Sequence, residues 1–193
     1  MNIKKIIISI LAITLICSMA MCIEKKSTLY DYSGKSTINV EVNGQLVNLP
    51  LRTTVEDALS TKLINTNLQQ IKEDYNNHQI IYIEYDKNLP AKNGGISITD
   101  LVSKLKYYNS LVGNKKYIVD DSTFNNQTEI NNIKNSNKTL IIKIITSNTP
   151  AQIIKNGNTY IIEGNSLKEL DKGTTLYALA IYTNSSERYY VTL

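Results

Sequence analysis

The chain has 193 residues, of which 21 are basic and 17 acidic, with two cysteines and no tryptophan. Lys4 and Lys5 account for two of the basic residues, so the remainder holds 19 basic against 17 acidic side chains and has little electrostatic attraction for nucleic acid. Because Cys17 and Cys22 both lie near the N-terminus, a disulfide, a cysteine-based zinc site and thiol catalysis are excluded from the rest of the chain.

The N-terminus has the pattern of a secretory leader. Lys4 and Lys5 precede an uncharged run of 18 residues, Ile6–Ile23. Three fates remain open: lipidation at Cys22, cleavage after Ala20, or retention as an anchor, for which about 17–25 apolar residues suffice. Cys22 resembles a lipoprotein attachment site, although a methionine precedes it where a small residue is usual. All three fates predict an extracytoplasmic body, membrane-anchored or secreted, because the basic flank keeps the N-terminus inside.

Composition divides the chain into five segments. Residues 1–22 form the signal peptide or membrane anchor, and residues 23–35 form a polar tether. Residues 36–120 are predicted to hold a hairpin and helix followed by a β-α-β part. Residues 121–138 are polar and form either a loop or a linker, so the sequence leaves one domain or two open. Residues 139–193 form a C-terminal hairpin, helix and strand.

The first structured segment begins with a hairpin. Residues 38–51 alternate apolar and polar side chains around Asn43-Gly44, the dipeptide that best tolerates the positive φ angles of a type I′ turn. Residues 53–64 then predict a helix, because Thr53 and Glu56 have capping-box spacing and apolar residues recur on one helical face.

Strand and helix patterns alternate along the middle of the chain. The segment 79–85 is rich in β-branched and aromatic residues and predicts a strand covered on both faces. A helix is expected over 98–112, where Thr99 is a candidate cap and Gly113 a candidate end. The remaining elements expected here are a helix over 68–75 and a short strand over 116–119.

The last third repeats this organisation. After one expected helical turn at 129–134, residues 139–146 predict a second buried strand, and a second hairpin follows around Asn156-Gly157. Ser166 and Glu169 form a capping box that opens a helix. The segment "RYYVTL", residues 188–193, is expected to be a strand. Together these elements predict an α/β or α+β fold: a partly parallel mixed sheet with two Asn-Gly β-hairpins and helices packed on it.

Residues 139–182 hold a buried strand, Pro150 in the loop after it, the Asn156-Gly157 turn, and Gly164 before a helix with small residues. In this order of features they resemble part of the surface-layer and related cell-envelope proteins of methanogenic archaea. The loop differs, because "TSNTP" replaces the family's Gly-Gly-Pro-like sequence. The resemblance implies a structural or cell-surface role and carries over no catalytic residue.

The best candidate binding residues are Asp120 and Asp121. They follow the short strand predicted over 116–119, and open α/β sheets bind ligands at such strand ends. Adjacent carboxylates with nearby asparagine oxygens suit Ca²⁺ or Mg²⁺, although the spacing does not match an EF-hand loop. A solvated turn is the competing interpretation, because aspartate favours turns. The sequence predicts no other cofactor.

Three asparagines lie in glycosylation sequons, which suits surface positions in an exported protein. They are Asn126, Asn137 and Asn184. His78 is the only histidine, and neither a multi-histidine zinc site nor a recognisable serine-nucleophile motif accompanies it.

These observations favour a non-enzymatic envelope protein with a structural or binding role. Its expected partners are the membrane, through the N-terminus, and other envelope proteins; nucleic acid is not expected. The alternative is an extracytoplasmic carboxylate-based hydrolase whose site is assembled from acids distant in the sequence.

Overall fold

The computed structural model describes residues 36–86, 94–119 and 127–183. It begins with an antiparallel hairpin of β1 (Thr37–Val42) and β2 (Gln45–Pro50). Asn43 and Gly44 have φ angles of 50° and 76°, which confirms the predicted turn with two positive-φ central residues. One face of the hairpin is buried and apolar, whereas most side chains on the other face are exposed.

The remaining strands form one mixed sheet of six strands in the order β3-β7-β8-β6-β4-β5. Strands β5, β4, β6 and β8 are mutually parallel; β7 is antiparallel to β8, and β3 is parallel to β7. The expected partly parallel sheet is therefore confirmed. The strand bounds are β3 (Lys62–Ile64), β4 (Ile80–Tyr85), β5 (Lys116–Val119), β6 (Thr139–Thr146), β7 (Gln152–Asn156) and β8 (Thr159–Gly164).

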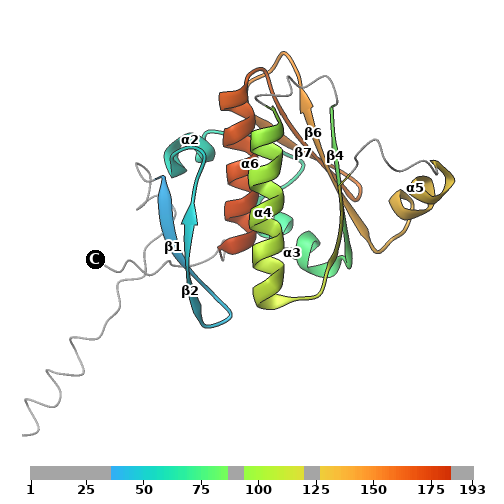
Figure 1. Ribbon diagram of the computed structural model, residues 1–193. Helices are drawn as coiled ribbons and strands as arrows, with labels where there is room; N and C mark the ends of the chain where they lie inside the picture. The colour runs from blue at the N-terminus through green and yellow to red at the C-terminus, as the bar shows by residue number, and fades with distance from the viewer. Residues whose placement is uncertain (1–35, 87–93, 120–126, 184–193) are drawn as a thin grey trace, which may run out of the picture.

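Helices cover both faces of this sheet. Figure 1 shows α4 and α6 side by side between the hairpin and the sheet, with α5 beyond the opposite face of the sheet. The helix bounds are α2 (Val55–Leu59), α3 (Leu68–Asn77), α4 (Gly94–Val112), α5 (Gln127–Lys134) and α6 (Leu167–Tyr182). The hairpin thus has helices beneath its apolar face and does not join the larger sheet.

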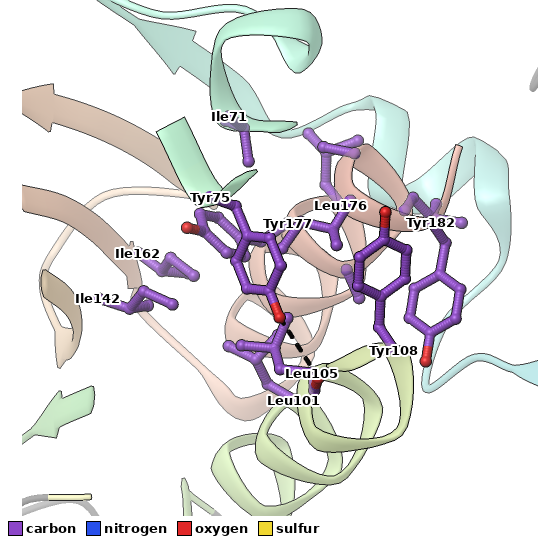
Figure 2. Packing of buried hydrophobic residues seen from close by; sticks show 14 of the residues in the cluster. Ile71, Tyr75, Leu101, Leu105, Tyr108, Ile142, Ile162, Leu176, Tyr177 and Tyr182 are labelled. Atoms are coloured by element: carbon purple, nitrogen blue, oxygen red, sulfur yellow. Dashed lines mark hydrogen bonds between the residues drawn. The ribbon is translucent and has the colours of Figure 1, made fainter. Parts of the chain in front are cut away.

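Helix α6 occupies the centre of the core. Twelve of its 16 residues are buried, because α2, α3, α4, β8 and the hairpin all pack around it. Figure 2 shows sheet residues Ile142 and Ile162 on one side of this core and Leu101 and Leu105 of α4 on another. The core cluster holds residues from Ile38 to Tyr182, so the segments before and after 121–138 share one sheet and one core.

The helix predicted over 53–64 is more than twice as long as the observed helix α2, which has five residues. Its N-cap is Thr54, whose side chain accepts a hydrogen bond from the Asp57 N–H, and the helix ends after Leu59. Residues 62–64 instead form β3, because the edge of β7 offers them a parallel pairing partner. Tertiary pairing therefore overrides the helical periodicity of this stretch.

Smaller shifts occur at two other predicted boundaries. Helix α4 begins at Gly94, so Thr99 lies within it, and the helix ends before Gly113 as expected. In the second hairpin the turn residues are Gly157 and Asn158, one position later than predicted, with φ of 57° at Gly157. The predicted cap is confirmed at Ser166, which accepts a hydrogen bond from the Glu169 N–H. The strand expected over 188–193 lies outside the described residues.

Candidate functional site

The C-terminal ends of the parallel strands lie together on one side of the six-stranded sheet. Strand β4 leads to α4 and onward to β5 at one side, whereas β6 leads to β7 and β8 at the other. Neighbouring strands whose connections depart in opposite directions form a topological switch point, the place where open α/β sheets bind ligands. The boundary between the C-terminal ends of β4 and β6 is therefore the candidate site.

Asp86 and Thr146 meet at this switch point. The Asp86 N–H donates to the Ile144 carbonyl at 3.0 Å, which continues the β4–β6 ladder by one residue. The Thr146 hydroxyl then donates to the Asp86 carboxylate at 3.1 Å. This places one carboxylate and one hydroxyl at the mouth of the strand pair, where both are exposed enough to meet a solute.

Two further carboxylates, those of Glu163 and Glu169, lie near the same ends of the strands. Glu163 near the end of β8 accepts hydrogen bonds from the Thr149 hydroxyl, at 3.1 Å, and from the Gln152 amide. Glu169 in the first turn of α6 accepts from the Ala151 N–H at 2.8 Å and pairs with Lys172. These contacts connect the β6–β7 loop to β8 and to the start of α6. Carboxylates that accept hydrogen bonds from the loop therefore fix its position.

The face of the sheet that carries α5 holds a three-membered charge cluster. The Glu84 carboxylate lies 2.9 Å from the Lys134 ammonium and 3.4 Å from that of Lys143. Burial acts to raise the pKa of Glu84, but the two lysines outweigh it and hold that pKa below its ordinary value. Lys134 also lies over the Tyr82 ring, 4.8 Å from its centre, so it joins α5 to β4.

A comparable cluster surrounds Asp74 of α3, near the N-terminal ends of the parallel strands. Its carboxylate accepts the Tyr160 hydroxyl and pairs with Lys155, both at 2.6 Å. His78 follows α3 as its C-cap, with ring nitrogen Nδ1 2.6 Å from the Asp74 carbonyl oxygen. This histidine therefore contacts the helix end.

Most of the residues that the sequence singles out lie outside the described part of the chain. Asp120 and Asp121 follow β5, which is confirmed as a strand ending at Val119, but neither aspartate is described. Cys22, Asn126 and Asn184 are likewise outside. Asn137 is exposed in the turn between α5 and β6, whereas Thr139, the third residue of its sequon, is buried.

Across residues 36–86, 94–119 and 127–183, no three His, Cys, Asp or Glu side chains gather as a set that could hold a metal ion. Over the same ranges, no helix combines the length and apolarity needed to cross a bilayer. The calcium or magnesium site at Asp120 and Asp121, and the N-terminal anchor, both stay predictions.

Sequence reasoning missed Asp86, although a usable signal was present. Asp86 directly follows the strand predicted over 79–85, so the rule that selects Asp120 and Asp121 applies equally to it. Its partner Thr146 is 60 residues away, and only the β4–β6 pairing brings the two together.

The fold, with its switch point between β4 and β6, defines an open α/β protein whose helices cover both faces of a mixed sheet. The chain is 38% identical over 200 aligned residues to "Uncharacterized protein MJ0259" of Methanocaldococcus jannaschii, and the alignment covers 94% of this chain and 98% of that protein. It therefore belongs to the same family as this archaeal protein. No protein-family model matches the chain, and no solved structure matches it.

Proposed function

We propose that the protein is an exported, membrane-anchored component of the cell envelope with a non-enzymatic structural or binding role. The observation that carries the proposal is the N-terminal sequence, where Lys4 and Lys5 precede the uncharged run Ile6–Ile23 and Cys22 closes that run. Such a leader directs the body of a protein across a membrane, and a lipid on Cys22 would then hold it at the surface.

The composition of the body supports the same role. No cysteine follows Cys22, so an oxidising exterior can form no disulfide within the body, and stability must come from packing. The core around α6 supplies that packing with side chains from both the sheet and the hairpin. A body of this kind, with many of its carboxylates paired to neighbouring lysines, suits a stable module displayed in solvent.

Intact mass of the protein extracted from membranes tests the anchor. A lipid adduct that disappears in Cys22→Ser and persists in Cys17→Ser is expected, because only Cys22 has the position of an attachment site. Protease added outside intact cells should digest the body while a cytosolic marker survives. An unmodified full-length chain recovered from the cytosol, protected from that protease, would contradict the proposal.

The alternative function, a carboxylate-based hydrolase outside the cytoplasm, draws support from one position. Asp86 lies at the switch point with the Thr146 hydroxyl 3.1 Å from its carboxylate, where a polar substrate would meet the ends of β4 and β6. Glycoside hydrolysis requires a second carboxylate, for which Asp120 and Asp121 are the sequence candidates. If this function holds, Asp86→Asn should abolish hydrolysis of a glycoside panel, whereas Glu41→Gln on the distant hairpin should retain it.

A further inference from the structure

The hairpin is a two-stranded sheet, and no strand within the described residues covers the outer edge of β1. The Leu51 N–H donates to the Ser36 carbonyl at 2.7 Å, which fixes the alternation of hydrogen-bonded pairs between the two strands. The backbone N–H and C=O groups of Thr37, Asn39 and Glu41 consequently point away from β2. No hydrogen bond from any described residue reaches those groups.

This edge is suited to an added strand, whereas the edge of β2 is less so. The outward positions of β2 include Pro50, which has no N–H to donate. On β1, all three outward residues can donate and accept. The alternate side chains Ile38, Val40 and Val42 are buried toward the helices. Apolar side chains of an added strand would lie beside this buried face of β1.

The C-terminal end of α6 lies toward the turn end of the hairpin. The Asp171 carboxylate near the start of α6 contacts Arg52, which follows the open end of the hairpin. The Tyr182 hydroxyl near the end of α6 donates to the Lys104 carbonyl, and Asn43 in the turn contacts the Leu111 carbonyl farther along α4. A segment that follows α6 and returns along the hairpin would run antiparallel to β1.

We propose that residues 188–193, "RYYVTL", add to β1 as an antiparallel third strand with Arg188 directly opposite Glu41. In this register Tyr189 and Val191 lie on the buried side of the hairpin, and Arg188, Tyr190 and Thr192 lie on the solvent side. Residues 184–187 supply the link; four extended residues span up to about 13 Å. The occupant of the edge is thus a segment of the same chain, which lies outside the described residues.

Charge and apolar pattern select this register over its neighbours. Glu41 is exposed on β1, and opposite charges directly across an antiparallel pair attract. A slip by one residue would turn Arg188 toward the buried side and Tyr189 and Val191 into solvent. The proposal does not depend on where the protein is located in the cell.

Hydrogen exchange on the full chain tests the strand. The amides of Thr37, Asn39 and Glu41 should exchange slowly in the unaltered protein and roughly tenfold or more faster in Tyr190→Pro, because proline removes a ladder donor and breaks the added strand. The amides of Val40 and Val47 pair with each other and serve as the internal control, with unchanged exchange. If the three edge amides already exchange at the rate of exposed loops in the unaltered protein, the proposal is wrong.

Crosslinking fixes the register and the identity of the occupant. In a chain that also carries Cys17→Ser and Cys22→Ser, Asn39→Cys with Tyr190→Cys places the only two thiols on the same face of paired strands and should form a disulfide in a protein that remains monomeric. Asn39→Cys with Tyr189→Cys is the matched control and should not crosslink, because its two side chains point to opposite faces. Disulfide-linked dimers would assign the edge to a second copy, and slow edge amides without a crosslink would assign it to the 23–35 tether; either result overturns the proposal.

Discussion

Gly173 of α6 lies so close to β8 that a Cβ atom built on it would come within 2.7 Å of the Ile162 Cγ2 atom. Real Cβ atoms do not approach other atoms so closely, so α6 can pack this close to β8 only because position 173 has no side chain. Gly164 has the same property, since a Cβ there would lie 2.8 Å from the Glu169 Cβ. The two glycines set the approach of α6 to the sheet.

Gly173→Ala should therefore destabilise the protein. The added methyl group forces α6 away from Ile162, and overpacking of this kind costs about 1–3 kcal/mol. Denaturant unfolding measures the loss. Gly95→Ala is the matched control: it lies in α4 with nothing within 4 Å of the added Cβ, so its free energy of unfolding should stay the same or rise. Equal losses in the two variants would contradict the close-packing argument.

Asp171 joins three elements at the open end of the hairpin. Its carboxylate accepts from the Arg52 Nε and Nη2 at 3.3 and 3.4 Å and from the Ser97 hydroxyl at 2.6 Å. Asp171→Ala should lower the free energy of unfolding by about 1–3 kcal/mol, because it leaves a buried hydroxyl and the guanidinium unpaired.

Arg52→Ala should cost less, about 1 kcal/mol, because this side chain is 34% exposed and water can replace its contact. A double-mutant cycle of Arg52→Ala and Asp171→Ala, followed by chemical denaturation, measures the coupling. Additive losses would show that the two side chains do not stabilise each other.

The Asp74 cluster makes stability sensitive to acid. Burial acts to raise the pKa of Asp74, but hydrogen bonds from Lys155, Tyr160 and Gln70 outweigh it and hold that pKa below its ordinary value of 3.8. A depressed folded-state pKa contributes stability that is present above 3.8 and is lost as the pH falls through the folded value. The free energy of unfolding should fall as the pH drops below 3.8, and less steeply in Asp74→Asn. Identical slopes would exclude Asp74 as a contributor.

A pair of tyrosines, the buried Tyr75 and the partly buried Tyr117, makes stability sensitive to alkali. The Tyr75 and Tyr117 hydroxyls hydrogen-bond to each other, and Tyr117 also donates to the Leu105 carbonyl at 2.8 Å. Burial raises the pKa of Tyr117 to about 12, against an ordinary value of 10.0. A raised pKa contributes stability that is complete below pH 10 and is lost as the pH rises toward 12.

Tyr117→Phe removes one of these titrating groups. Its free energy of unfolding should be lower than that of the unaltered protein at pH 8 and should decline less steeply above pH 10. Tyr107→Phe is the control, because Tyr107 is 51% exposed and should leave both the level and the slope nearly unchanged. Parallel curves for Tyr117→Phe and the unaltered protein would contradict the assignment.

Local signals in the sequence were sufficient for the regular elements. The β-branched runs of β4 and β6, the Asn43-Gly44 turn and the Ser166 cap depend on neighbours within a few residues, and each was predicted. Strand β3 was not, because residues 62–64 continue a helix-like apolar spacing and become a strand only by pairing with β7.

The candidate site was less predictable than the fold. Thr146 lies beside Asp86 only because β6 inserts between β4 and β8, and single-sequence periodicity does not reveal strand order. The Arg52–Asp171 contact spans 119 residues and gives no local signal either. The predicted end of β5 directly before Asp120 is confirmed, but the same strand-end reasoning, applied to β4, would also have selected Asp86.

The position of α6 in the chain has a consequence for biosynthesis. This helix supplies the centre of the core, yet it follows all eight described strands in sequence order, so those strands have no completed interior to collapse onto until residue 182 has been synthesised. A ribosome adding about 5–20 residues per second would leave the earlier segments without their final packing for several seconds.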